Sequence, residues 1–115
     1  MRHKTLAMIK TERFSTELQD LAGLAKVLSH PARLMILSYL AEQKVCMSGD
    51  ISKEIPLSRT TVSQHLKELK NAGLIHGTIE GLKVNYCLKP DAIHSLKISF
   101  NDFLSKIDFN EPQCC

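Results

Sequence analysis

The sequence contains no tryptophan and few aromatic residues, so its core must be built mainly from aliphatic side chains. Only 5% of the 115 residues are aromatic, whereas 43% are hydrophobic and 23% are charged, fractions typical of a folded globular protein. A chain of this length forms one compact domain and buries a modest core. We therefore expect oligomerisation to contribute to its stability.

No stretch approaches the about 18 consecutive apolar residues that indicate a membrane-spanning helix. The first residues, MRHKTLAMIK, are basic but lack the long apolar run of a signal peptide. We expect a soluble, cytoplasmic protein with no membrane partner. The cysteines at positions 46, 87, 114 and 115 do not have the spacing of a disulfide framework, and a reducing cytoplasm predicts free thiols.

Sequence signatures of catalysis are absent as well. The chain has no Cys-x-x-Cys, no Gly-rich phosphate loop, no paired-carboxylate motif and no Ser/His/Asp arrangement. The five histidines, at positions 3, 30, 65, 76 and 94, are scattered and show no ligand spacing. We expect a protein that is not an enzyme and requires no cofactor.

Positive charge is concentrated in the middle of the chain. Residues 44–90 contain seven Lys or Arg against four Asp or Glu, whereas residues 91–115 contain two against four. A polyanion is therefore expected to bind the middle of the chain and not its end.

The spacing of apolar residues predicts two helices in the first part of the chain. The first begins after the N-cap Ser15 and extends to about Leu28, and the second runs from Pro31 to about Gln43. A short helix around residues 48–55 follows and stops at Pro56. The apolar stripe of the first helix comprises Phe14, Leu18, Leu21, Ala25 and Leu28. The buried side of the second comprises Leu34, Leu37 and Leu40.

A longer helix and a hairpin are predicted next. Ser58 caps a helix from Arg59 to about Asn71, which Gly73 terminates. Residues 74–80 and 82–88 alternate like two strands joined by a tight turn at Glu80-Gly81. A last helix opens at Pro90-Asp91, with Asp91 as its expected N-cap. Its apolar face comprises Ile93, Leu96, Phe100, Phe103, Leu104 and Ile107.

This order of elements predicts a mainly α fold with a small β-hairpin. A short helix, a turn at residues 56–58 and a longer helix form a helix-turn-helix, and the hairpin behind it forms a wing. We divide the chain into a basic arm (1–13), a winged helix-turn-helix domain for DNA binding and dimerisation (14–108), and a tail (109–115). The stripes on residues 14–28 and 93–107 are longer than a lone wing requires, which favours a dimer.

The helix that follows Ser58 separates apolar from polar residues. Val62, Leu66 and Leu69 recur at spacings of 4 and 3 and are expected to face the core. The polar residues left outside are Arg59, Thr60, Thr61, Ser63, Gln64 and Lys67. Arg reads guanine, Gln reads adenine, and Ser and Thr suit phosphates or the thymine methyl group. A protein-interaction module would instead favour an apolar or acidic outer face, so double-stranded DNA is the expected partner.

Three segments in this chain carry recognisable motifs. They are HPARLMILSYL (30–40), SRTTVSQHLKELKNAGLI (58–75) and EGLKVNYCL (80–88), in order and at matching intervals. Together they resemble the ArsR/SmtB family of winged-helix repressors, over about residues 15–107. The resemblance implies a homodimer formed by the first and last helices. It also implies repression of an operon until an inducer binds.

The candidate DNA-binding residues combine the polar helix face with its flanks. Arg33 and His65 match family motifs, and a structural role is the more usual one for a histidine placed like His65. Lys83 in the wing is a candidate phosphate contact, against the alternative of a solvated lysine. The full candidate set is Ser58, Arg59, Thr60, Thr61, Ser63, Gln64, His65, Lys67 and Lys83.

The cysteines suggest an inducer site. The resemblance implies a thiol site where the short helix begins, yet here only Cys46 is present and no second cysteine follows. Cys114 and Cys115 are adjacent, which disfavours a disulfide between them and leaves both thiols available. With Cys46 they could bind arsenite or antimonite through three sulfurs, while zinc or cadmium would need a further ligand such as histidine. The alternatives are an oxidant sensor or a tail with inert thiols. Cys87 is expected to be a packing residue.

Overall fold

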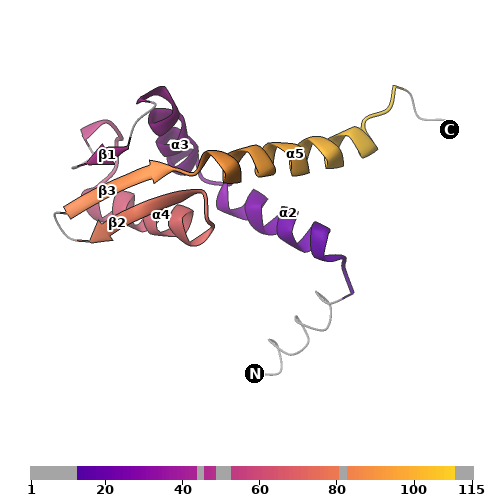
Figure 1. The fold of residues 1–115 in the computed structure, drawn as a ribbon, viewed down its shortest axis with the longest axis horizontal. Coiled ribbons are helices and arrows are strands. Elements are labelled where there is room, and N and C mark those ends of the chain that lie inside the picture. Colours follow the sequence, from indigo (N-terminus) through magenta and orange to yellow (C-terminus); the bar gives the residue numbers. More distant parts are fainter. Residues whose placement is uncertain (1–12, 44–45, 49–52, 81–82, 111–115) are drawn as a thin grey trace.

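The computed structural model describes residues 13–43, 46–48, 53–80 and 83–110, with the backbone alone at 47–48, 79–80 and 83–84. Helix α2 (Thr16–Val27) leads into α3 (Pro31–Gln43), and the short strand β1 (Met47–Ser48) precedes α4 (Arg59–Asn71). Strands β2 (Ile75–Glu80) and β3 (Lys83–Leu88) form a hairpin that runs into the long helix α5 (Pro90–Ile107). Figure 1 shows this order. The mainly α fold with a β-hairpin is confirmed.

The strands form one antiparallel sheet in the order β1-β3-β2. Met47 lies opposite Tyr86 on one side of β3, and Ile75 lies opposite Leu88 on the other. The prediction that a helix begins at Ser48 is wrong, because Ser48 is the second residue of β1. A strand of two residues is too short to show alternation, so only its pairing with β3 reveals it. Most of the remaining predicted helix, residues 49–52, lies outside the described residues.

The predicted helix boundaries near the caps are confirmed. Ser15 caps α2 by accepting a hydrogen bond from the Leu18 amide at 3.2 Å. At the end of α4, Gly73 has φ +80°, and the amides of Gly73 and Leu74 donate back to the carbonyls of Lys70 and Leu69. This paired bonding terminates the helix and requires a left-handed residue that glycine adopts without strain.

The prediction that Asp91 caps the last helix is wrong. Lys89 is the N-cap of α5 and makes no side-chain capping bond, while Asp91 lies within the first turn. Pro90 occupies the first helical position, where its fixed φ suits the helix and its missing N–H is not needed. A carboxylate in the first turn remains favourable because it faces the positive end of the helix dipole.

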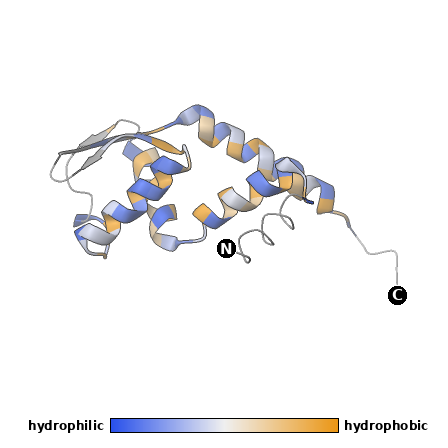
Figure 2. Cartoon of the chain, turned by 90° about the horizontal axis from the view of Figure 1, so that it is seen from below, coloured by the Kyte–Doolittle hydropathy of each residue, from blue (hydrophilic) through white to orange (hydrophobic). Residues whose placement is uncertain are grey.

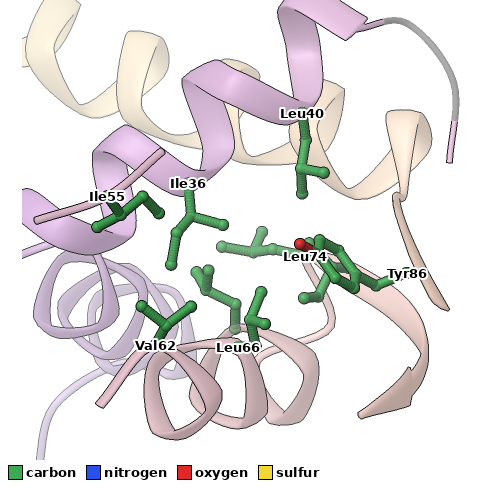
Figure 3. Packing of buried hydrophobic residues seen from close by; sticks show 9 residues of the cluster. Ile36, Leu40, Ile55, Val62, Leu66, Leu74 and Tyr86 are labelled. Carbon is green, nitrogen blue, oxygen red and sulfur yellow. The ribbon is translucent and has the colours of Figure 1, made fainter. Parts of the chain in front are cut away.

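The core lies between α3, α4 and the sheet, a unit that we call the head. Its buried apolar residues are Ile36, Leu40, Ile55, Val62, Leu66, Leu69, Leu74, Ile75 and Tyr86 (Figure 3). The prediction that α3 buries Leu34 is wrong, because Leu34 is 48% exposed and Ile36 is fully buried. Apolar residues surround α3 on several sides, so the spacing alone could not select the face that meets α4 and β3.

Helices α2 and α5 form a second unit, the helical arm, which extends from the head (Figures 1 and 2). The head-proximal residues Leu24, Val27, Leu28, Ala92, Ile93 and Leu96 pack against the core. Further out, both helices leave large apolar side chains exposed. In the parts of the chain that the structure describes, no helix is long and apolar enough to cross a membrane.

Candidate DNA-binding surface

Helix α4 has a buried face and an exposed face. Val62, Leu66 and Leu69 are buried against the head core, as predicted from their spacing. On the opposite side, Thr60, Gln64 and Lys67 are exposed. Because these three residues are also spaced by 4 and 3, they form one continuous strip along the helix. The burial of one face therefore orients the other toward solvent.

The N-terminus of α4 adds polar groups to this strip. The Ser58 hydroxyl accepts a hydrogen bond from the Thr61 amide at 3.2 Å and lies 2.8 Å from the Thr61 hydroxyl. The first turn contains no acidic residue, and Arg59 is exposed beside it. The positive end of the helix dipole favours a phosphate nearby. The hydroxyls of Ser58 and Thr61 stabilise the helix end as well as lying on this surface.

The structure describes the side chains of most of the predicted DNA contacts, but not that of Lys83. The structure brings Arg59, Thr60, Thr61, Gln64 and Lys67 together on the exposed side of α4. Ser63 is only half-exposed. Lys83 is the first residue of β3, and its side chain lies outside what the structure describes.

His65 belongs to a separate contact beneath this surface. Its Nδ1 atom accepts a hydrogen bond of 3.0 Å from Nε of Arg33, on α3. Nη1 of Arg33 also donates to the carbonyl oxygen of Val27, at 3.1 Å, at the end of α2. The ring of His30 lies 5.5 Å from that of His65, between centroids. His65 is half-buried and turned toward α3, away from the strip formed by Gln64 and its neighbours.

The surroundings of His65 favour its neutral form. Burial is the largest effect that lowers its pKa, followed by the positive charge of Arg33 and the neighbouring His30, while Glu68 acts in the opposite direction. Sequence reasoning identified Arg33 and His65 separately, through family motifs, but not their contact. The two residues are 32 positions apart, and only the packing of α3 on α4 brings them together.

Two cysteines form a disulfide between β3 and the residue before β1. Cys46 is bonded to Cys87, with Cα atoms 4.3 Å apart. The expectation of free thiols is wrong for this pair, and Cys87 is more than a packing residue. The reason is the register of the sheet: Met47 pairs with Tyr86, so the residue before Met47 lies opposite the residue after Tyr86. The spacing of cysteines along the sequence contains no information about that register.

The proposed metal ligands are only partly visible in the structure. Cys46 is held in the disulfide, and Cys114 and Cys115 lie outside the described residues. Within the described parts of the chain, no group of three or more His, Cys, Asp or Glu residues is placed to hold a metal ion. The described residues alone therefore do not form a metal site.

A family model and several curated proteins match this chain. Residues 30–76 match the model described as bacterial regulatory protein, arsR family. The transcriptional regulator CmtR of Mycobacterium tuberculosis is 40% identical over 68 residues, which are 59% of this chain and 57% of the relative. The biofilm growth-associated repressor of Xylella fastidiosa is 32% identical over 75 residues, 65% of each chain. The chain thus spans less than two thirds of these two relatives.

A third relative is covered more completely. The transcriptional regulator Rv2034 of Mycobacterium tuberculosis is 31% identical over 81 residues, which are 70% of this chain and 75% of the relative. Among solved structures, an ArsR-like regulator from Rhodococcus has a TM-score of 0.61 at 20% identity, covering 79% of this chain and 85% of the other. Rv0081 of Mycobacterium tuberculosis has a TM-score of 0.58 at 27% identity, covering 82% and 94%. The fold is the same in these proteins.

Proposed function

The chain belongs to the arsR family of bacterial regulatory proteins, which are transcriptional regulators and not enzymes, and we propose that it is a repressor that reads its operator with α4. Regulators of this family bind double-stranded DNA through their helix-turn-helix. The observation that supports α4 as the reading element is its division into one buried apolar face and one exposed polar, cationic face. A helix of this kind fits the major groove, and the hairpin β2–β3 fits beside it as a wing.

The exposed side chains of α4 suit specific roles on DNA. Gln64 can bond adenine and Arg59 can bond guanine, each through two hydrogen bonds. Thr60 offers a hydroxyl and a methyl group to a phosphate or a thymine, and Lys67 offers a charge to a phosphate. Lys83 is proposed to contact a phosphate from the wing. Gel-shift titration on the DNA upstream of the gene tests this function, and failure to bind any part of it with preference over unrelated DNA would refute it.

The helical arm is proposed to pair two copies of the chain. A groove between α2 and α5 combines apolar residues, Leu18, Leu21, Leu24 and Phe103, with polar and charged ones such as Asp20, Asp102 and Lys106. Phe14 and Leu104 are 59% and 52% exposed, which is costly for side chains of this size when they stay in water. A two-fold dimer covers them and places two α4 helices about one DNA turn apart, roughly 34 Å. A monomeric mass by sedimentation at micromolar concentration would contradict this arrangement.

The proposed inducer is a thiophilic metal or metalloid, such as arsenite, held by Cys46, Cys114 and Cys115. Pyramidal arsenic takes three thiolates, and soft ions prefer sulfur ligands. Because Cys46 is oxidised in the disulfide, this site would require the reduced protein. Arsenite added to the reduced operator complex should release DNA. Changing both Cys114 and Cys115 to Ser should abolish that release, and unaltered release would remove the tail from the mechanism.

The Cys46–Cys87 disulfide favours a second candidate, a response to thiol oxidation. Two thiols and one hydrogen peroxide would give the disulfide and two waters, and a dithiol would reverse the reaction by becoming oxidised itself. The bond joins the wing to the segment before the helix-turn-helix, so it limits how the two adjust to DNA. We expect the oxidised protein to bind the operator more weakly than the reduced protein.

The two inducers can be separated with two cysteine variants. Cys87→Ser removes the disulfide but leaves all three proposed metal ligands in place. It should abolish the response to peroxide and keep the response to arsenite. Changing Cys114 and Cys115 to Ser should have the opposite effect, so each variant is the control for the other. If peroxide still released DNA from the Cys87→Ser variant, the disulfide would not be the sensor.

A further inference from the structure

We propose that Arg33 and His65 are positioning residues that hold α4 at a fixed angle to α2 and α3, and that acid weakens operator binding by breaking their contact. The inference rests on the proposed function, because it assigns a role to residues beneath the proposed DNA-reading surface. It differs from the sequence-based candidate role of His65, in which the imidazole itself would contact DNA.

One guanidinium group joins three helices. Nε of Arg33 bonds His65 on α4 at 3.0 Å, and Nη1 bonds the last carbonyl of α2, that of Val27, at 3.1 Å. Hydrogen bonds from a charged donor are stronger than neutral ones. Rotating α4, or separating α2 from α3, breaks at least one of them. Arg33 therefore links the helical arm, proposed to join the subunits, to the helix proposed to read DNA.

The contact requires a neutral His65 with a defined tautomer. A guanidinium group has only donors, so Nδ1 of His65 must be unprotonated, and the ring proton lies on Nε2. Protonation of Nδ1 would place an N–H against the N–H of Arg33 and a second positive charge beside it. His30 and Glu68 are the other ionisable groups that act on the ring. Glu68, on α4 itself, is the acidic one of these neighbours and favours protonation, whereas Arg33 and His30 oppose it.

The direction of the pH effect distinguishes positioning from reading. A histidine whose pKa in the fold lies below its ordinary 6.5 stabilises the folded arrangement fully above pH 6.5. This stabilisation is lost as the pH falls toward the lowered pKa. A histidine that contacts DNA behaves in the opposite way, because its added charge strengthens binding to phosphates. Acid should therefore weaken operator binding through His65, whereas it would strengthen binding through a DNA-contacting histidine.

A first test needs no DNA. Nitrogen NMR of the histidine rings in the isotopically labelled full-length protein reports both tautomer and titration midpoint. We expect His65 to be the Nε2–H tautomer with a midpoint below 6.5. An Nδ1–H tautomer, or a midpoint above 6.5, would overturn the proposal.

A second test measures operator affinity from about pH 7.5 to 5.5 at constant salt. His65→Leu removes the acceptor and should weaken binding about tenfold at the upper pH. His65→Asn places an amide oxygen where Nδ1 accepts, so it should restore affinity relative to His65→Leu and remove the acid-dependent loss. His94→Asn, a change at an exposed histidine of α5, is the matched control and should follow the wild-type pH profile.

Coupling between the two residues completes the design. Arg33→Met and His65→Leu should together weaken binding no more than Arg33→Met alone, because the Arg33 change already breaks the contact with His65 as well as the bond to Val27. Additive losses would overturn the proposal, as would wild-type binding that strengthens with acid and loses this trend in His65→Asn. A wild-type protein that binds no upstream DNA at any pH would instead refute the proposed function. The NMR result would still decide the inference in that case.

Discussion

The head and the helical arm use the same kinds of apolar residues in opposite ways. In the head, nine apolar residues are almost fully buried between α3, α4 and the sheet. In α2 and α5, whose residues are all described, none is buried, and Phe109 just beyond α5 is 69% exposed. The head therefore buries its apolar residues within the described chain, with help from the head-proximal ends of α2 and α5, whereas the outer part of the arm leaves apolar side chains exposed.

This difference also separates what orients α4 within one chain from what would place two chains relative to each other. Burial in the head orients α4, because Val62, Leu66 and Leu69 can enter the core in only one way. The exposed apolar residues of the arm do not determine, within one chain, how the heads of two copies would be placed relative to each other. If the arm pairs two copies, it sets the spacing of their α4 helices, and the Arg33 contact carries that setting to α4.

The largest expected effect concerns the covalent link within the head. The Cys46–Cys87 bond closes a loop with a sequence separation of 41. A loop of that size predicts that Cys87→Ser lowers the free energy of unfolding by about 4 kcal/mol, through the entropy of the unfolded chain. Urea denaturation of the oxidised protein at fixed concentration measures the loss. The control is the same variant under a dithiol, whose free energy of unfolding should not change. A wild type whose free energy of unfolding stays the same on reduction would contradict the prediction.

Core truncation should affect the head more than the arm. Leu69→Ala leaves a cavity where the side chain is fully buried and should cost about 2–5 kcal/mol of unfolding free energy. Leu104→Ala, the same chemical change on the arm, should cost less than about 1 kcal/mol in a monomer but weaken self-association. Denaturation together with sedimentation separates these effects. Equal loss of folding stability at both sites, without any change in mass, would remove the distinction between the two units.

Specific DNA recognition should depend on the exposed face of α4. Gln64→Ala or Arg59→Ala should weaken operator binding by roughly 1–3 kcal/mol if the residue bonds a base through two hydrogen bonds. Gln43→Ala, a change at an exposed glutamine at the end of α3, is the matched control. If neither Gln64→Ala nor Arg59→Ala changes operator affinity, α4 is not the helix in the groove.

The smallest effect is expected from the wing. Lys83→Ala should weaken binding to operator and unrelated DNA alike and reduce the slope of affinity against salt concentration by about one ion. Lys97→Ala on α5 provides the control, because it removes an equal charge from the helical arm, outside the wing. A loss confined to the operator would assign Lys83 to base reading instead.

The sequence was sufficient for most features that depend on neighbours along the chain, although it placed the cap of α5 at Asp91 instead of Lys89. Ser15, Ser58 and Gly73 terminate helices through bonds to residues three to five positions away, so their roles were predictable. The spacing of Val62, Leu66 and Leu69 likewise determined which side of α4 faces the core. Because the remaining side of a helix must then face outward, the same spacing also identified the polar residues on it.

Only the tertiary structure decided the contacts between distant segments. The choice of Ile36 over Leu34 depended on how α3 packs, because both are apolar and both lie on the same helix. The register of β1 on β3 joined Cys46 to Cys87, and the packing of α3 on α4 joined Arg33 to His65. Local periodicity reports which residues prefer burial, but pairing across 30 to 40 positions depends on the relative placement of whole elements, which no local pattern encodes.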